Sequence, residues 1–130
     1  MATGTRKVEY RLGDDVFEGL FASGDDIAGV VSFHGLFDPP GNTEGNRISA
    51  KVHVLHGWDD PLATPDEAVA LATELSAARV DWQIHAYGNV RHAFTNPAAD
   101  ASSGVTVYNA DADRRSWAAM RDFVSELFGS

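Results

Sequence analysis

Two polar motifs, each following a short β-like segment, constrain the fold of this chain more than any other feature of its sequence. The motif HGWDDP at residues 56–61 follows the apolar segment 52–55, and the motif GNVRHAF at residues 88–94 follows segment 81–87. Residues 65–78, which lie between them, have helical periodicity. A strand, a helix and a second strand in this order are typical of α/β proteins, in which such strands are parallel. Loops that follow parallel strands meet at one edge of the sheet, so we expect the two motifs to lie close together.

The N-terminal part of the chain predicts a hairpin and one further strand. Residues 7–12 and 16–21 are rich in β formers, and Gly13-Asp14-Asp15 between them has the composition of a tight turn, which indicates an antiparallel hairpin. Residues 27–33 are almost continuously apolar, as expected of a strand buried on both faces. Residues 36–49 contain two prolines and two glycines and are interpreted as a loop.

Two helices complete the predicted architecture. Residues 64–67 (TPDE) supply an N-cap hydroxyl, a proline at the first helical position and a glutamate that can close a capping box. After a long loop at 89–108, Asp111 or Asp113 can cap a last helix that Gly129 ends. The predicted apolar face of that helix consists of Trp117, Met120, Val124, Leu127 and Phe128. The fold class is therefore α/β, with an N-terminal antiparallel hairpin, three parallel strands and two main helices.

Composition limits the classes of protein to which the chain can belong. Its 130 residues predict a single domain, 1–130. A net charge of −9 opposes binding to nucleic acid and to anionic membranes. The absence of cysteine excludes disulfides, cysteine-ligated metals and thiol nucleophiles. Because Met1–Tyr10 lacks the apolar core of a signal peptide and no apolar run is long enough to span a bilayer, a cytoplasmic location is predicted.

In four segments the sequence resembles the C-terminal half of the dienelactone hydrolase family of α/β-hydrolases. The segments are AGVVSFHG at 28–35, VLHGWDDPL at 54–62, YGNVRHAFTNP at 87–97 and DRRSWAAMRDF at 113–123. Residues 7–21 resemble the first hairpin of the family. The segment that would connect these parts, with the central strands, the nucleophile elbow and the oxyanion-hole loop, is absent. The resemblance therefore implies a truncated α/β-hydrolase-like sheet.

The resemblance also implies a reaction and two catalytic residues. Members of the family hydrolyse carboxylic esters or lactones, with a histidine that moves protons and a carboxylate that orients it. The matching positions are His92 and Asp60; Asp60 is preferred to Asp59 because it directly precedes the Pro-Leu pair. Without the resemblance, Asp59 and Asp60 are interpreted as turn residues close to a helix start.

No residue of the sequence stands in the pattern of a nucleophile elbow, which is a serine or cysteine flanked by glycines between a strand and a helix. Thr43 has the glycine spacing but lies in a proline-rich loop without a following helix. Ser23 lacks the preceding glycine, Ser32 lies within a predicted strand, and Ser102–Ser103 lie in the long loop. We therefore expect weak or no hydrolase activity. The alternative is a catalytically inactive module that binds a small molecule, or an oligomeric remnant of the fold.

The sequence predicts neither a cofactor nor a metal site. His53 and His56 are an odd number of positions apart on one strand, so they point to opposite faces and form a poor metal pair. His34 ends a strand near the expected site, where it could line a pocket, but a structural hydrogen bond is its preferred role. A small ester or lactone is the expected ligand.

The missing central strands would leave the strand at 27–33 with an unpaired apolar edge. Such edges favour association, so a homodimer is predicted, in which the hairpin at 7–21 is the segment expected to cross between subunits.

Overall fold

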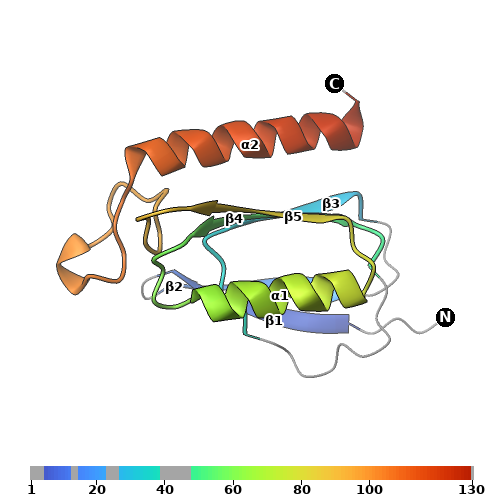
Figure 1. The fold of residues 1–130 in the computed structure, drawn as a ribbon, viewed down its shortest axis with the longest axis horizontal. Coiled ribbons are helices and arrows are strands. Elements are labelled where there is room, and N and C mark those ends of the chain that lie inside the picture. The colour runs from blue at the N-terminus through green and yellow to red at the C-terminus, as the bar shows by residue number, and fades with distance from the viewer. Residues whose placement is uncertain (1–4, 13–14, 23–26, 39–47, 130) are drawn as a thin grey trace.

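The computed structural model describes residues 5–12, 15–22, 27–38 and 48–129, which form two separate sheets and two long helices (Figure 1). Strands β1 (Thr5–Leu12) and β2 (Asp15–Ala22) pair antiparallel. Strands β3 (Gly29–Phe33), β4 (Lys51–Gly57) and β5 (Trp82–Tyr87) form a parallel sheet in the order β3-β4-β5. The predicted α/β class with three parallel strands is confirmed. Residues 13 and 14 of the predicted turn lie outside the described residues.

Strand β4 is the centre of the core. Every residue from Val52 to Gly57 is buried, because a neighbouring strand lies on each side and the helices α1 (Pro65–Ala77) and α2 (Ala110–Phe128) cover opposite faces of the sheet (Figure 1). Strand β4 ends at Gly57, two residues beyond Leu55, the last residue of the predicted strand segment. One apolar cluster has Val52, Val54, Leu75 and Val80 as its buried members. The other, beneath α2, has Leu55, Val90, Phe94 and Ala112.

Helix α1 begins as the sequence predicted. The backbone N–H of Thr64 donates to Oε2 of Glu67 at 2.7 Å, and Pro65 occupies the first helical position. The carbonyl of Thr64 accepts the first intrahelical bond, from the N–H of Ala68. These contacts satisfy backbone groups that a helix start leaves without partners, and they fix where the chain turns back after β4.

The predicted N-cap of the last helix was wrong. Asn109 caps α2, since its side-chain oxygen accepts a hydrogen bond from the N–H of Ala112 at 2.9 Å. Asp111 and Asp113 lie in the first turn instead, where their negative charges interact favourably with the helix dipole. Asparagine caps helices as well as aspartate does, so residue type alone does not favour either aspartate over Asn109. Gly129, with φ of 69°, ends the helix as predicted.

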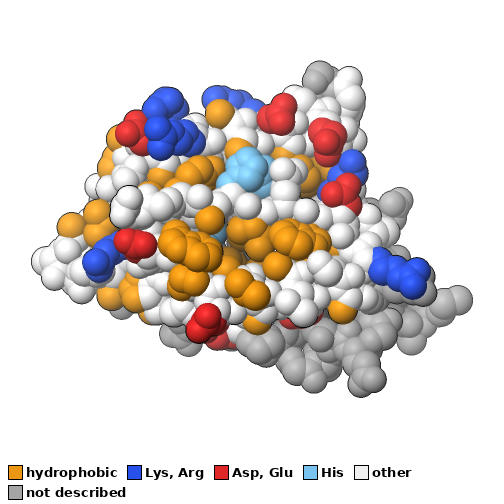
Figure 2. Space-filling view, viewed as in Figure 1, with side chains coloured by type: hydrophobic (Ala, Val, Ile, Leu, Met, Phe, Trp, Pro, Cys, Tyr) orange, Lys and Arg blue, Asp and Glu red, His pale blue; other side chains and the backbone are white. Residues whose placement is uncertain are grey.

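The predicted apolar face of α2 was only partly right. Phe123 and the small residues Ala112 and Ser116 are the buried positions of this helix. Trp117 and Phe128, which belong to the predicted apolar face, are 46% and 69% exposed. Hydrophobic side chains also gather on the surface between the two helices, with charged side chains around them (Figure 2). Within the described ranges, no helix is both long and apolar enough to cross a membrane.

Candidate active site

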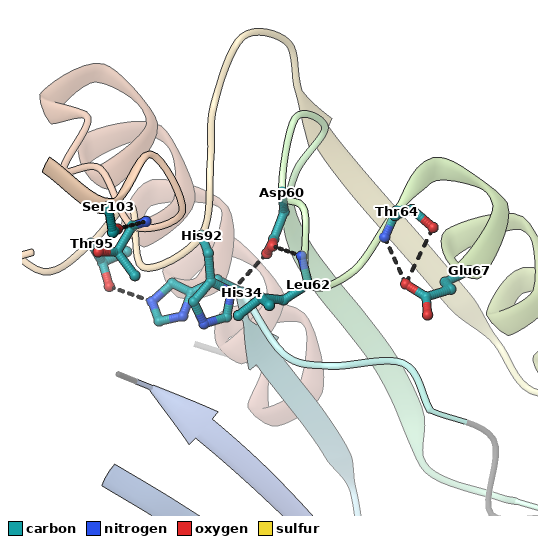
Figure 3. A network of polar contacts seen from close by, with 9 residues as sticks. His34, Asp60, Leu62, Thr64, Glu67, His92, Thr95 and Ser103 are labelled. Carbon is teal, nitrogen blue, oxygen red and sulfur yellow. Dashed lines mark hydrogen bonds and ion pairs between the residues drawn. The ribbon is translucent and has the colours of Figure 1, made fainter. Parts of the chain in front are cut away.

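The two motifs meet at the carboxyl edge of the parallel sheet. Nδ1 of His92 lies 2.7 Å from Oδ2 of Asp60, and both side chains are completely buried (Figure 3). The second carboxylate oxygen of Asp60 accepts a hydrogen bond from the N–H of Leu62 at 2.8 Å. The predicted contact between the two residues is therefore confirmed. An ionised carboxylate only accepts, so Nδ1 carries the proton of a neutral His92 ring and Nε2 is its basic nitrogen.

Backbone hydrogen bonds hold the two loops against each other. The N–H of Trp58 donates to the carbonyl of Tyr87, and the N–H of Asp59 donates to that of Val90, both at 2.9 Å. His92 is held on the other side by a bridge to Thr106. These bonds continue the pairing of β4 and β5 past the ends of the strands. The separation of Asp60 and His92 is thus set by main-chain contacts.

Gly57 permits this close approach of the loops. A Cβ at this position would lie 2.6 Å from the carbonyl oxygen of Val90 and 2.7 Å from that of Arg91. Both distances are far below van der Waals contact with backbone atoms, so only glycine fits without moving the loop that carries His92.

His34 also reaches the site, from the end of β3. Its Nε2 lies 2.9 Å from the hydroxyl of Thr95, which confirms the predicted structural hydrogen bond (Figure 3). Its ring stands edge-on to the ring of His92, with 5.4 Å between the centroids. Burial, and then the nearby His92, lower the pKa of His34 from 6.5 to about 4. Thr95 was not among the predicted site residues, although it lies in the same segment, 87–97, as His92.

His53 and His56 lie on different sides of β4, as predicted. The ring of His53 packs against Phe123 of α2, whereas the ring of His56 packs against Phe37. Both side chains are buried, and neither has a hydrogen-bond partner on either ring nitrogen. Burial lowers the pKa of each histidine. Among the described residues, no three histidine, aspartate or glutamate side chains form a group that could hold a metal ion.

Among the serines considered as nucleophiles, the structure describes Ser32, Ser102 and Ser103, and each has a structural setting. Ser32 lies within β3, opposite Val54 in the strand register. The hydroxyl of Ser102 donates to Oδ1 of Asp100 and that of Ser103 to its carbonyl, in a short 3-10 helix at Ala101–Ser103. These two hydroxyls shape the long loop. Ser23 and Thr43 lie outside the described residues.

The fold and the two loop motifs agree with a match to a known family. The family model described as "Dienelactone hydrolase family" matches residues 16–128. The chain belongs to the dienelactone hydrolase family. The matched residues include the parallel sheet, both helices and the loops that carry Asp60 and His92.

Individual relatives agree with this assignment. A dienelactone hydrolase-like promiscuous phosphotriesterase from metagenomic libraries is 40% identical, with a TM-score of 0.66 over 77% of this chain and 42% of that one. The protein m3DLH is 37% identical, with a TM-score of 0.71 over 80% of this chain and 44% of that one. An uncharacterised protein of Caenorhabditis elegans is 34% identical over 110 residues, which are 80% of this chain and 67% of that protein. The chain thus spans less than half the length of these two solved relatives.

Proposed function

We propose that this chain carries the histidine and carboxylate half of a site that hydrolyses carboxylic esters or lactones. The observation that carries the proposal is the fully buried 2.7 Å contact between Nδ1 of His92 and Oδ2 of Asp60 at the carboxyl edge of the sheet. In this role His92 is the general base, and Asp60 fixes its tautomer and stabilises the imidazolium that forms.

We further propose that the chain alone is a weak hydrolase. A water molecule attacks the ester carbonyl while Nε2 of His92 removes its proton, and the same proton is then returned to the departing alkoxide. The sequence offers no elbow serine or cysteine that would make this attack more efficient. Lack of a single oxyanion-hole donor costs about a hundredfold to a thousandfold in rate, so activated esters are the expected substrates.

Hydrolysis of an activated aryl ester tests the proposal. His92→Ala is expected to reduce the rate to that of the ester in buffer, and Asp60→Asn to reduce it by about tenfold or more. Asp59→Asn is the matched control, because Asp59 is the exposed neighbour of Asp60. A phosphotriester is a useful second substrate, since one solved relative is described as a promiscuous phosphotriesterase.

Three outcomes of this assay contradict the proposal. Ester turnover that survives His92→Ala would mean that another group is the base. A parent protein that binds an ester or lactone but never turns it over would favour the inactive binding module, and a parent that does neither would favour an oligomeric remnant.

A further inference from the structure

We infer that His34 is a positioning residue that holds the ring of His92 against Asp60. The inference rests on the proposed function of His92 as the base. One buried ring, from another part of the sheet, keeps that base in its working rotamer.

The backbone of His34 is fixed firmly enough to position another side chain. Its N–H donates to the carbonyl of Leu55 at 2.9 Å, which extends the pairing of β3 with β4 by one residue. Its φ of 39° lies in the left-handed region, which a residue with a side chain occupies at a cost. The side chain is 9% exposed. The strained turn therefore directs this ring into the protein.

A single ring contacts three residues of the loop that carries the base. The ring of His34 stands edge-on to His92 at 5.4 Å and edge-on to Phe94 at 5.2 Å, as measured between centroids. Its Nε2 is 2.9 Å from the hydroxyl of Thr95 (Figure 3). Phe94 is fully buried, and Ala93 adopts a φ of 58°. The contacts of His34 thus hold the loop that carries His92 against the end of β3.

The charge state of His34 suits this role. Burial, and then the positive form of His92, lower the pKa of His34 to about 4, although a backbone hydrogen bond and Asp60 act in the opposite direction. Within the described part of the chain, His92 and Asp60 are the charged side chains that act on it. Near neutral pH the ring is therefore uncharged, so it packs against His92 without repelling the imidazolium that proton transfer produces.

Proton NMR of the intact chain can test the inference without relying on catalysis. The Nδ1 proton of His92, bonded to Asp60, is expected as a resonance far downfield that His92→Ala removes. His34→Ala should abolish this resonance, because the empty space lets the His92 ring turn away and exposes the proton to water. His34→Phe should restore it, because a ring of similar shape fills the space. Thr95→Val should leave the resonance in place but speed its exchange with water.

His85→Ala is the matched control, since His85 is an exposed histidine of β5, the strand at the other edge of the sheet. A parent protein without the downfield resonance would contradict the proposed function itself. A resonance that is present, and that exchanges equally fast in His34→Ala and the parent, would overturn only the inference about His34. If His34→Ala fails to fold, Thr95→Val decides, and an unchanged exchange rate there overturns the inference.

Discussion

At the scale of single residues, His34 should make the stability of the protein depend on pH. Its pKa is about 4 in the folded protein and 6.5 in an unfolded chain. The folded value is the lower one, so its stabilising contribution is complete above pH 6.5 and is lost as the pH falls towards 4. The difference corresponds to about 3 kcal/mol at most. We expect urea unfolding to show a smaller loss of stability between pH 7 and pH 5 in His34→Phe than in the parent. Equal losses would contradict the assignment.

Replacing His56 by phenylalanine should stabilise the protein, whereas the same replacement of His92 should destabilise it. His56 is fully buried and both its ring nitrogens lack partners, so His56→Phe removes unpaired polar groups while keeping a ring against Phe37. We expect a gain of about 1 kcal/mol in the free energy of unfolding. The matched change His92→Phe leaves the buried carboxylate of Asp60 without its partner and should cost about 3 kcal/mol. Denaturant titrations of both variants check this, and a destabilised His56→Phe protein would indicate that the ring has an unrecognised polar role.

At the scale of elements, the sequence predicted what local rules determine. The start of α1 was predictable because Thr64, Pro65 and Glu67 act within a single turn. The meeting of the two polar motifs was predictable because parallel strands bring their following loops to one edge. The N-cap of α2 was not, because the choice of Asn109 also depends on a tertiary contact, from its N–H to the carbonyl of Phe94. The bond from His34 to Thr95 spans 61 residues, a distance over which periodicity and turn chemistry carry no information.

Because the two loops are in contact, alanine at Gly57 and alanine at Gly88 should have very different effects on stability and on ester hydrolysis. Gly57→Ala introduces a Cβ 2.6 Å from the carbonyl oxygen of Val90, so the loop that carries His92 must move away from β4. We expect a loss of about 1–3 kcal/mol in stability and a loss of ester hydrolysis. Gly88→Ala is the control, because its Cβ would meet no atom within 4 Å. Unfolding and activity measurements on both variants decide, and equal behaviour would show that the loops are not held in register through Gly57.

At the scale of the whole molecule, the sheet has an apolar strand at one edge. Among the described strands, β3 is hydrogen-bonded to β4 alone, and its sequence is Gly-Val-Val-Ser-Phe. In the opposite edge strand, β5, partly buried residues alternate with exposed polar residues such as Gln83 and His85. The ring of Trp117 lies 5.0 Å from that of Phe33 and is 46% exposed, so helix α2 extends the apolar surface beside β3. Apolar edges of this kind favour pairing with a second chain.

We therefore predict a homodimer that forms through β3 and the adjoining face of α2. Trp117→Lys adds a charge beside this edge and should shift the mass seen by light scattering towards the monomer. Val69→Lys is the control, because Val69 is 61% exposed on α1, which covers the other face of the sheet. The net charge of −9 makes two copies repel each other, so added salt should strengthen the dimer. A parent protein that stays monomeric at high micromolar concentration in high salt would refute the prediction. A dimer that Val69→Lys disrupts and Trp117→Lys leaves intact would place the interface on α1 instead.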